Sequence, residues 1–478
     1  MSSTKQGNLT HKDYLNLSSC CISLMFFGSV NCWNHILPFY LKSIYNESEN
    51  TNKYYIENSI LQNSFNLSIL ILIVSNLFKF FGTYFNKYLG LKNTLLISYF
   101  LLILSNVILL FTKGIFQTYL SIFLYSISNG ISFLSILEEM WKIFPISRGL
   151  ITGILNSSNI FGIFIFNPFY DYLKNDNLFL VINSTLFSLG CVFILFCLNI
   201  KEKKKKKERR SFNENDSENL QELNEALNSE NNDENVNEYI NENVSSDEEE
   251  NKAKKEKKEL LKMFSEIFSF KYVYIISSFL LLLASIYIVS ISYLSFMYLN
   301  TIPMIKHKKV YFYIYMISYS ISSILFGYLY DFKGFRNRII YLISVYSFSL
   351  LLFIPLLKIS YLIFIIEIIN AYALGGVNTM FLPVFYKEFS SEFCFRIMGL
   401  TLSLSSIVYF IIPIIMKKLV FNLFGCFVFY IFAFLLNFEA YSLITNFLYP
   451  INLSILQNEQ QYKIDLNKQD EPRELATE

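Results

Sequence analysis

Twelve apolar segments dominate this sequence and set the strongest limit on how it can fold. A helix needs about 20 apolar residues to cross the hydrocarbon core of a bilayer, where every backbone polar group must be paired internally. The segments lie at about 17–41, 62–85, 93–112, 115–137, 148–169, 178–199, 271–298, 310–330, 338–357, 361–385, 397–416 and 421–447. Since each reaches the required length, the chain is predicted to be an all-α membrane protein with twelve transmembrane helices.

The composition agrees with this interpretation. Hydrophobic residues make up 53% of the 478 residues and charged residues only 16%, which is more apolar surface than one soluble core can bury. The formal net charge is +2, and most charges lie in one central block and in the two tails. The remainder is nearly uncharged, so nucleic-acid binding is not expected.

Metal, cofactor and catalytic sites are also not expected. The seven cysteines form no CxxC pair, and the three histidines form no HExxH motif. The sequence contains neither a phosphate-binding loop nor a recognisable nucleophile–base set. We therefore predict that the protein is not an enzyme and needs no cofactor.

The central block at 200–265 separates the twelve segments into two sets of six. It begins KEKKKKKERR and continues through an Asn- and Glu-rich tract, a composition that cannot form a core. We predict a disordered linker, with a short basic amphipathic helix at 254–268 that lies at the membrane surface. The lysine-rich linker is expected to contact anionic lipid or a cytoplasmic protein. The domains expected are an N-terminal bundle at 1–199, this linker, a C-terminal bundle at 266–450 and a tail at 451–478.

Positive charge near the ends of the spans predicts the orientation. The lysine-rich stretches at 201–210 and 252–262 outweigh every other loop, which places the linker and both termini in the cytoplasm. Because residues 1–16 are polar and the first apolar run has full span length, a signal-anchor helix is favoured over a cleaved signal peptide. We expect a monomer in the plasma membrane, with an organellar membrane as the alternative.

The two sets of spans also resemble each other. The fifth span opens with RGL at 148–150 and continues into a Ser/Asn-rich helix, and the eleventh opens with Arg396 and Gly399-Leu400 before a serine-rich helix. Two six-helix repeats that move against each other are a known arrangement for carrying a solute across a membrane.

A compact charged connector, GYLYDFKGFRNR at 327–338, joins the eighth and ninth spans. It resembles the cytoplasmic signature of the major facilitator superfamily, G-x-x-x-D-x-x-G-x-R. The matching residues are Gly327, Asp331, Gly334 and Arg336, and Arg338 follows them. The glycines permit close helix approach and a sharp turn. The carboxylate can accept hydrogen bonds from a helix N-terminus or pair with an arginine in one of the two gate states. We interpret the connector as a gating latch; an ordinary positive-inside loop would explain its basic residues but not its acid and glycines.

The corresponding loop of the first half departs from the signature twice. It has Gly82, but Asn86 replaces the acid and the second glycine, Gly90, arrives one residue late. An amide can cap a helix but supplies no charge, so this latch is expected to be weaker or differently built.

A second resemblance concerns both halves. The run FGSVNCW at 27–33, Tyr45, QNSFNL at 62–67, the region from Phe144 to Arg148 and residues 385–399 are similar to the apicomplexan amino acid transporters. These in turn resemble the system-L facilitators, solute carrier family 43. The resemblance implies facilitated transport of amino acids.

Polar side chains inside spans are the candidate solute ligands, because they usually face the bundle interior. In the first span, Asn31, Asn34 and His35 share one helix face. Asn31 is adjacent to a glycine-containing stretch where the helix can widen or unwind. A buried histidine can equally be a packing residue, and that alternative stays open for His35.

The second half and the fifth span supply the other candidates. Glu367, Asn370 and Asn378 fall within an arc of about 80° on the tenth span. The carboxylate of Glu367 would accept hydrogen bonds from an ammonium group, or it pairs structurally. Asn156 on the fifth span and Tyr293 on the seventh add an amide and a hydroxyl. Serines near them can also join helices without touching a solute.

Together these features predict a carrier for small organic solutes, most simply amino acids, that works by alternating access. Only Glu367 and His35 are candidates for a proton relay, so a uniporter or exchanger is expected. Two alternatives stay open. In the first, the cargo is a sugar, nucleoside, monocarboxylate or drug-like metabolite. In the second, the protein is a receptor or scaffold of the same fold that no longer transports.

Overall fold

The computed structural model describes most of the membrane region and part of its connections. The described residues are 10–46, 53–111, 114–173, 176–198, 261, 270–299, 308–333, 339, 341–343, 345–346, 360–388, 393–416 and 431–444. For some of these the structure gives the backbone but not the side chain. The chain divides into two compact units, Met1–Cys197 with Phe270–Glu478, and Leu198–Ser269. The helices discussed below belong to the first unit.

The first half contributes five consecutive helical stretches, one of which, α3, contains two of the predicted spans. They are α1 (His11–Gly28) with η1 (Ser29–Cys32) and α2 (Trp33–Asn46), α3 (Lys53–Phe111), α4 (Ile115–Ile143), α5 (Arg148–Leu173) and α6 (Asp176–Cys197). A capping box starts α1, where Asp13 Oδ2 accepts the Thr10 N–H at 2.8 Å. The predicted second and third spans both lie in α3, which turns at Gly90.

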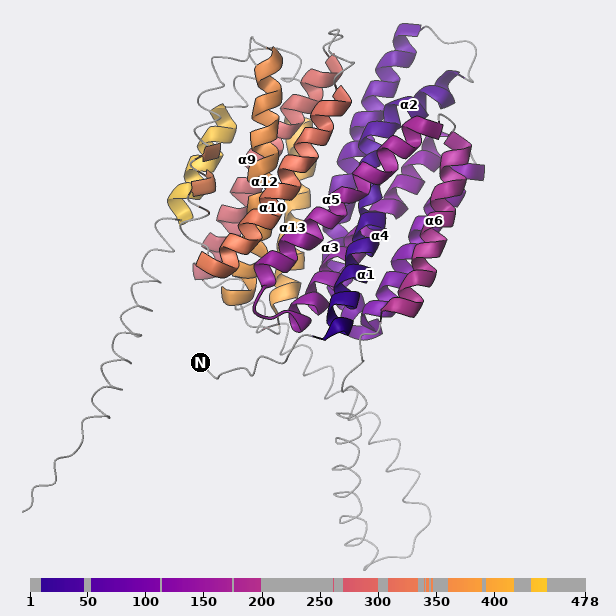
Figure 1. Cartoon of the computed structure of the whole chain (residues 1–478). Coiled ribbons are helices and arrows are strands. Elements are labelled where there is room, and N and C mark those ends of the chain that lie inside the picture. Colours follow the sequence, from indigo (N-terminus) through magenta and orange to yellow (C-terminus); the bar gives the residue numbers. More distant parts are fainter. Residues whose placement is uncertain are drawn as a thin grey trace, which may run out of the picture. The chain divides into compact units, whose positions relative to one another are not determined.

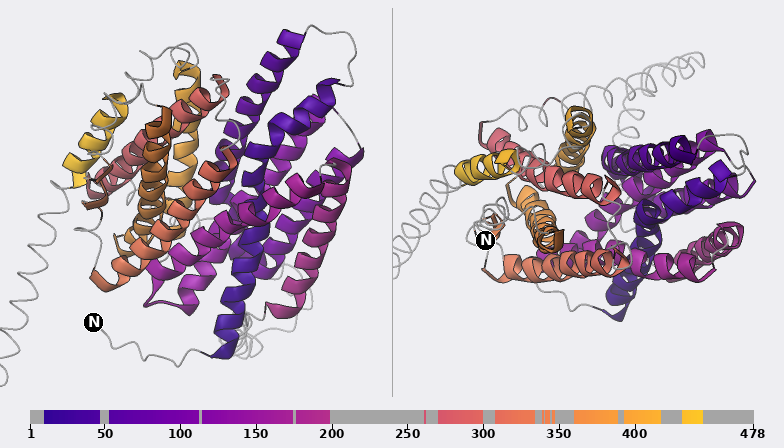
Figure 2. Two further views of the ribbon diagram at one scale, coloured as in Figure 1. Left: turned by 45° about the horizontal axis from the view of Figure 1, so that its top comes forward. Right: turned by 90° about the horizontal axis from the view of Figure 1, so that it is seen from above.

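The second half follows the same plan. Its helices are α9 (Phe270–Leu299), α10 (Lys308–Lys333), α12 (Ser360–Glu388) and α13 (Cys394–Met416), with further helical residues at 431–444 and within 339–346. Helical residues therefore lie in all twelve predicted spans. Figure 1 shows α1 to α6 grouped together and α9 to α13 grouped together, and the views in Figure 2 show the same grouping.

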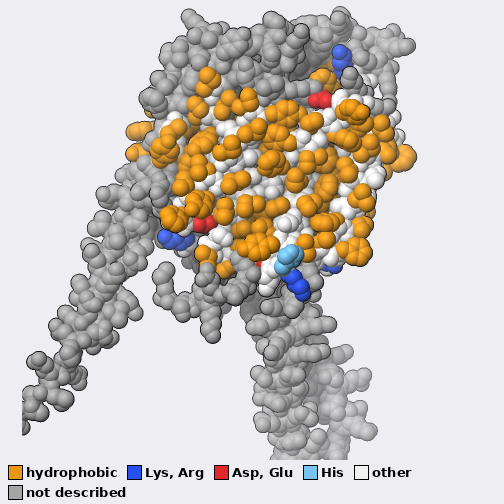
Figure 3. Space-filling view, viewed as in Figure 1, with side chains coloured by type: hydrophobic (Ala, Val, Ile, Leu, Met, Phe, Trp, Pro, Cys, Tyr) orange, Lys and Arg blue, Asp and Glu red, His pale blue; other side chains and the backbone are white. Residues whose placement is uncertain are grey.

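The outer surface of these helices suits a lipid environment. Figure 3 shows a face covered by hydrophobic side chains, with charged side chains near its upper and lower margins. Phe111 and Phe196 are 79% and 83% exposed, an arrangement that is unfavourable in water but favourable against acyl chains. Within the described residues, six helices are long and apolar enough to cross a membrane by length and composition.

Close contacts between α5 and α10 join the two halves. A Cβ on Gly149 would lie 2.5 Å from the carbonyl oxygen of Gly327, and one on Gly153 would overlap the backbone of Ser323. One turn further along α5, Ser157 Oγ donates to the carbonyl oxygen of Ser320 at 3.0 Å. Small residues therefore bring these two backbones together, as is common for helices packed in membranes.

The pair α13 and α3 repeats this arrangement. A Cβ on Gly399 would lie 2.8 Å from Phe80 Cα. Ser403 Oγ donates to the carbonyl oxygen of Leu77 at 3.0 Å, and Ser406 Oγ donates to that of Ile73 at 3.1 Å. In each case the fifth helix of one half packs its small and hydroxyl residues against the second helix of the other half.

Candidate transport site and gate

The first span departs from α-helical geometry where it meets α5. Residues Ser29–Cys32 form a 3₁₀ segment directly after Gly28. A Cβ on Gly28 would overlap the carbonyl oxygen of Asn159, so the α5 backbone occupies the space that a side chain would need. Asn31 lies within this segment. Tighter helix winding inside a span often marks a functional position.

Asn31 begins a chain of hydrogen bonds that crosses the first half. Its Nδ2 donates to Asn159 Oδ1 at 3.3 Å, and Asn159 Nδ2 donates to Asn129 Oδ1 at 3.0 Å. Asn129 Nδ2 then donates to Ser75 Oγ at 3.1 Å. We call these four residues the amide chain. It links η1, α5, α4 and α3 with groups that both donate and accept hydrogen bonds without net charge.

A lysine lies one turn beyond the end of the amide chain. Lys79 on α3 donates from Nζ to Asn76 Oδ1 at 2.7 Å, and its ammonium lies 5.2 Å from the centroid of the Phe133 ring. Lysines inside transmembrane segments are rare, and those that occur usually face the bundle interior and mark a functional position. Lys79 is therefore a candidate for such a role.

Sequence reasoning did not identify Asn129 or Lys79. The signal for Lys79 was present, because it is a charged residue inside the predicted span 62–85. Asn129 precedes Gly130 in the middle of the fourth span, and a Cβ on Gly130 would overlap the carbonyl oxygen of Ser75. This close approach of α4 to α3 is what brings Asn129 within hydrogen-bond distance of Ser75.

The predicted amides of the other helices have separate partners. Asn156 Nδ2 donates to Thr379 Oγ1 at 3.3 Å, a bond that joins α5 to α12 and so connects the two halves. Asn378 Nδ2 donates to the Tyr319 hydroxyl at 3.3 Å. Asn370 is fully buried, and its Nδ2 donates to the carbonyl oxygen of Ile286 at 3.4 Å. None of these three hydrogen bonds has a partner in the amide chain.

Four other predicted ligands fall outside the described side chains. They are Asn34, His35, Tyr293 and Glu367. Their roles stay predictions. On the seventh span, Ser285 Oγ donates to the carbonyl oxygen of Ala433 at 2.7 Å, so this serine joins two helices.

The carboxylate of Asp331 connects the end of α10 to the start of α5. Its Oδ1 accepts the Gly149 N–H at 2.8 Å and its Oδ2 accepts the Leu150 N–H at 2.7 Å. These N–H groups belong to the first turn of α5, where a helix leaves its amides unpaired and its dipole favours a negative charge. The latch residue thus bonds to the opposite half. Gly334, Arg336 and Arg338 lie outside the described residues.

The surroundings of Asp331 affect its charge in opposite ways. Asp331 lies just beyond the predicted span 310–330. Partial burial has the larger effect and raises the pKa of its carboxyl above the usual value, although the N–H groups of Leu150 and Gly149 and the guanidinium of Arg148 act to lower it. Arg148 itself lies over the Tyr386 ring, 3.7 Å from the ring centroid.

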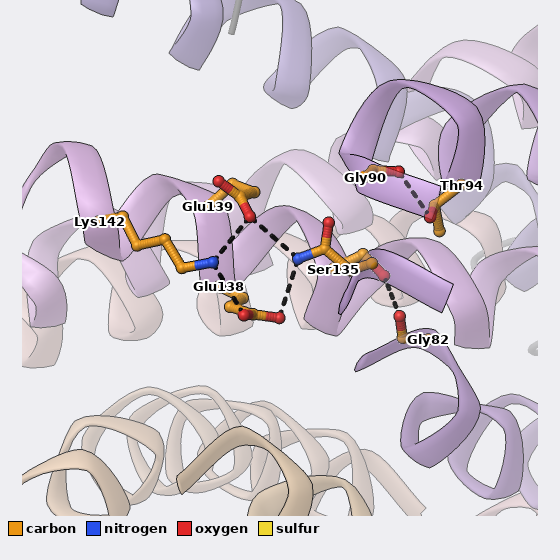
Figure 4. A network of polar contacts seen from close by, with 8 residues as sticks. Gly82, Gly90, Thr94, Ser135, Glu138, Glu139 and Lys142 are labelled. Atoms are coloured by element: carbon orange, nitrogen blue, oxygen red, sulfur yellow. Dashed lines mark hydrogen bonds and ion pairs between the residues drawn. The ribbon is translucent and has the colours of Figure 1, made fainter. Parts of the chain in front are cut away.

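The first-half loop is built differently from the second-half loop. Figure 4 shows Glu138, Glu139 and Lys142 of α4 close to one another, and Gly82 and Gly90 of the loop. Asn86 Nδ2 donates to Glu138 Oε2 at 2.9 Å and to Glu139 Oε1 at 3.1 Å. Lys142 forms ion pairs with the same two acids at 2.9 and 2.8 Å. Asn86 therefore bonds to α4 of its own half, whereas Asp331 bonds across the halves.

The two glycines of this loop, Gly82 and Gly90, have different structural roles. A Cβ on Gly82 would overlap the carbonyl oxygen of Ile131, so Gly82 permits α3 to approach α4. Gly90 has φ 79° and provides the turn between the two parts of α3, where Thr94 Oγ1 donates to its carbonyl oxygen at 2.9 Å.

Aromatic contacts close the end of the bundle that carries Asp331. The centroid of the Trp141 ring lies 5.6 Å from that of Tyr386 and 5.1 Å from that of Phe395. Tyr386 and Phe395 belong to the other half. Trp141 Nε1 donates to Thr152 Oγ1 at 3.0 Å, which fixes its orientation. At this end, polar and aromatic contacts together hold the halves against each other.

Comparison with known proteins places the chain among membrane carriers. The family model described as Major Facilitator Superfamily matches residues 19–413. Among solved structures, the chain is similar to the MFS (major facilitator superfamily) proton:xylose symporter XylE bound to 6-bromo-6-deoxy-D-glucose. The TM-score is 0.63 at 13% sequence identity, and the match covers 90% of this chain and 96% of that chain. No curated protein matches the sequence. The likeness in structure confirms the predicted fold.

Proposed function

The chain belongs to the major facilitator superfamily and is a multi-pass membrane transporter of small solutes rather than an enzyme; from this premise we propose that its cargo is an amino acid. We further propose that it works by alternating access as a uniporter or exchanger. The amide chain of Asn31, Asn159, Asn129 and Ser75 carries the proposal. It supplies donors and acceptors inside the spans, which suit a zwitterion with an ammonium and a carboxylate group.

Two features support an amino acid in particular. Asn31 lies within residues 27–33, one of the stretches that resemble amino acid transporters of the apicomplexan and system-L type. The described residues within the spans also include many buried amides and hydroxyls, which can orient a zwitterion without adding net charge.

We assign the gating role to Asp331 and the glycine pair Gly149 and Gly327. In this proposal the carboxylate stabilises the closed state by bonding to α5 and releases that helix when the halves separate. We place this end in the cytoplasm, together with the linker and both termini, because of the lysine-rich stretches at 201–210 and 252–262. Labelling of tagged termini and of a tagged linker in intact and permeabilised cells tests the orientation.

A sugar is the second candidate cargo. The solved structure that the chain resembles is a proton:xylose symporter bound to a glucose derivative, and amide side chains also bind sugar hydroxyls. A transporter-like receptor or scaffold is the third candidate.

Uptake measurements separate these three functions. Purified protein in proteoliposomes is assayed with radiolabelled amino acids and with radiolabelled D-glucose and D-xylose. Saturable amino acid uptake that is lost in Asn159→Ala supports the proposal. Uptake of the sugars alone would replace it with the second candidate. Absence of any uptake by well-folded protein, together with no thermal stabilisation by these solutes, would favour the receptor.

A further inference from the structure

We propose that Lys79 binds the anionic group of the transported solute, which is the α-carboxylate if the cargo is an amino acid. The inference rests on the proposed transport function and deepens it, since it identifies the charge that the solute must carry. Neither the family match nor the predicted ligands assign a role to this residue.

Lys79 belongs to the same structural unit as the amide chain. Ser75 and Lys79 are four residues apart on α3, and Asn129 and Phe133 are four residues apart on α4, so each pair shares a helix face. Asn129 Nδ2 lies 3.1 Å from Ser75 Oγ, and Lys79 Nζ lies 5.2 Å from the centroid of Phe133. The ammonium therefore extends the row of amides by one helical turn.

The side chain of Lys79 does not extend toward the nearer end of its span. A lysine near the end of a span usually extends its ammonium toward the interface. Lys79 instead donates to Asn76, which lies one turn closer to the middle of the predicted span 62–85. The side chain is only partly exposed. The charge is thus held within the bundle, in the direction of the amide chain.

Its described partners leave the positive charge uncompensated. Within the part of the chain that the structure describes, the ammonium contacts the amide of Asn76 and the ring of Phe133 but forms no ion pair. By contrast, Lys142 at the closed end pairs with two acids. An intramembrane ammonium without a carboxylate is a ready site for an anion that arrives with the solute.

Internal repetition provides a second argument. The two glycine loops align Gly82 with Gly327 and Asn86 with Asp331, and in this register Lys79 aligns with Ile324. The helices α10 and α12 pack as closely as α3 and α4 do, because a Cβ on Gly375 would overlap the backbone of Tyr319. They do so with the uncharged Ile324 at the position of Lys79. The lysine is therefore not required for packing of the repeated fold, and its presence in one half agrees with an asymmetric ligand.

Transport and binding by lysine variants test the proposal. Lys79→Met, Lys79→Arg and the control Lys92→Met are reconstituted and assayed for uptake of radiolabelled proteinogenic amino acids. Lys92 is a matched control because it also lies on α3, but its Nζ donates to the Leu195 carbonyl oxygen at an exposed position. We expect Lys79→Met to raise KM roughly tenfold or more, Lys79→Arg to raise it less, and Lys92→Met to leave it unchanged.

Binding provides a readout that does not depend on turnover. An amino acid that stabilises the wild-type protein against heat should also stabilise Lys92→Met but not Lys79→Met. The corresponding amino acid amide lacks the carboxylate and should stabilise none of the three proteins. If Lys79→Met does not fold, Lys79→Cys takes its place. A cationic aminoethyl thiosulfonate reagent should then restore uptake, and an anionic sulfonatoethyl reagent should not, with treated wild type as the reference.

The outcomes distinguish this inference from the proposed function. Amino acid uptake with an unchanged KM in Lys79→Met, or a Lys79→Cys protein that the cationic reagent does not restore, overturns the role of Lys79 alone. If the wild type carries only uncharged sugars, or neither carries nor binds any of these solutes, both the amino acid cargo and the role of Lys79 are wrong.

Discussion

Removal of the Asp331 carboxylate gives the most direct test of the gate. In Asp331→Ala, the first-turn N–H groups of Gly149 and Leu150 lose acceptors that lie 2.8 and 2.7 Å away. A hydrogen bond to a charged group contributes about 1.5–3 kcal/mol, and a charge at a helix N-terminus about 0.3–1 kcal/mol. Because Asp331 is exposed in part, these terms are reduced by solvent. We estimate a net loss of about 2 kcal/mol from the closed state, which is roughly a 30-fold change in the equilibrium between closed and open.

Amide hydrogen exchange measures this change at the bonds themselves. We expect the start of α5, residues 148–156, to exchange faster in Asp331→Ala by up to about that factor, and Asp331→Asn to give an intermediate result because its amide oxygen still accepts a bond. Asp13→Ala is the matched control, since Asp13 accepts the Thr10 N–H at the start of α1, a bond within the first half. It should leave α5 unchanged. Equal exchange of residues 148–156 in wild type and Asp331→Ala would refute the latch.

Three further substitutions test other parts of the structure. Asn159→Ala breaks the amide chain at its centre and should lower uptake about 5- to 30-fold for a loss of about 1–2 kcal/mol, whereas Ser188→Ala, on an exposed face of α6, should not change uptake. Gly153→Ala forces α5 away from the α10 backbone and should lower the midpoint of thermal unfolding. Gly114→Ala is the control, because the added methyl group contacts only a flexible side chain. Equal midpoints for the two variants would contradict the close packing. Trp141→Ala removes ring contacts between the halves and should increase labelling of cysteines introduced at the closed end; unchanged labelling would exclude a gating role for this ring.

Some of this structure is predictable because it depends on local sequence. The apolar segments locate the helices, since span length and the need to pair the backbone leave no other choice in a bilayer. The motif predicts a helix N-terminus or an arginine as the partner of Asp331, and the structure shows the helix N-terminus, whose unpaired N–H groups suit a carboxylate. The turn at Gly90 is likewise expected of a glycine in a short connector.

Other features depend on which helix surfaces meet, and the sequence of one helix does not contain that information. Asn86 has two acids of α4 as partners, a pairing set by the position of α3 against α4 where Gly82 permits close approach. The amide chain requires η1, α5, α4 and α3 to converge. Asn129 and Lys79 become notable only when that convergence brings Ser75 and Phe133 beside them.

The two loops have consequences for how the halves separate. Asp331 bonds across the halves, so the seam between α10 and α5 includes a charge-assisted contact in addition to its close glycine packing. Asn86 bonds within its own half, so the seam between α3 and α13 depends on other contacts. Ser403 Oγ donates to the Leu77 carbonyl oxygen, and the Arg396 guanidinium lies 5.6 Å from the centroid of the Tyr84 ring. Opening at this end must therefore overcome different forces on its two sides. Since Lys79 lies on α3, the seam without the charged latch is the one next to the proposed anion site. Under the proposal made above, solute at Lys79 acts at this seam, and it shifts the equilibrium between the closed and open states only by the difference in its affinity for the two states.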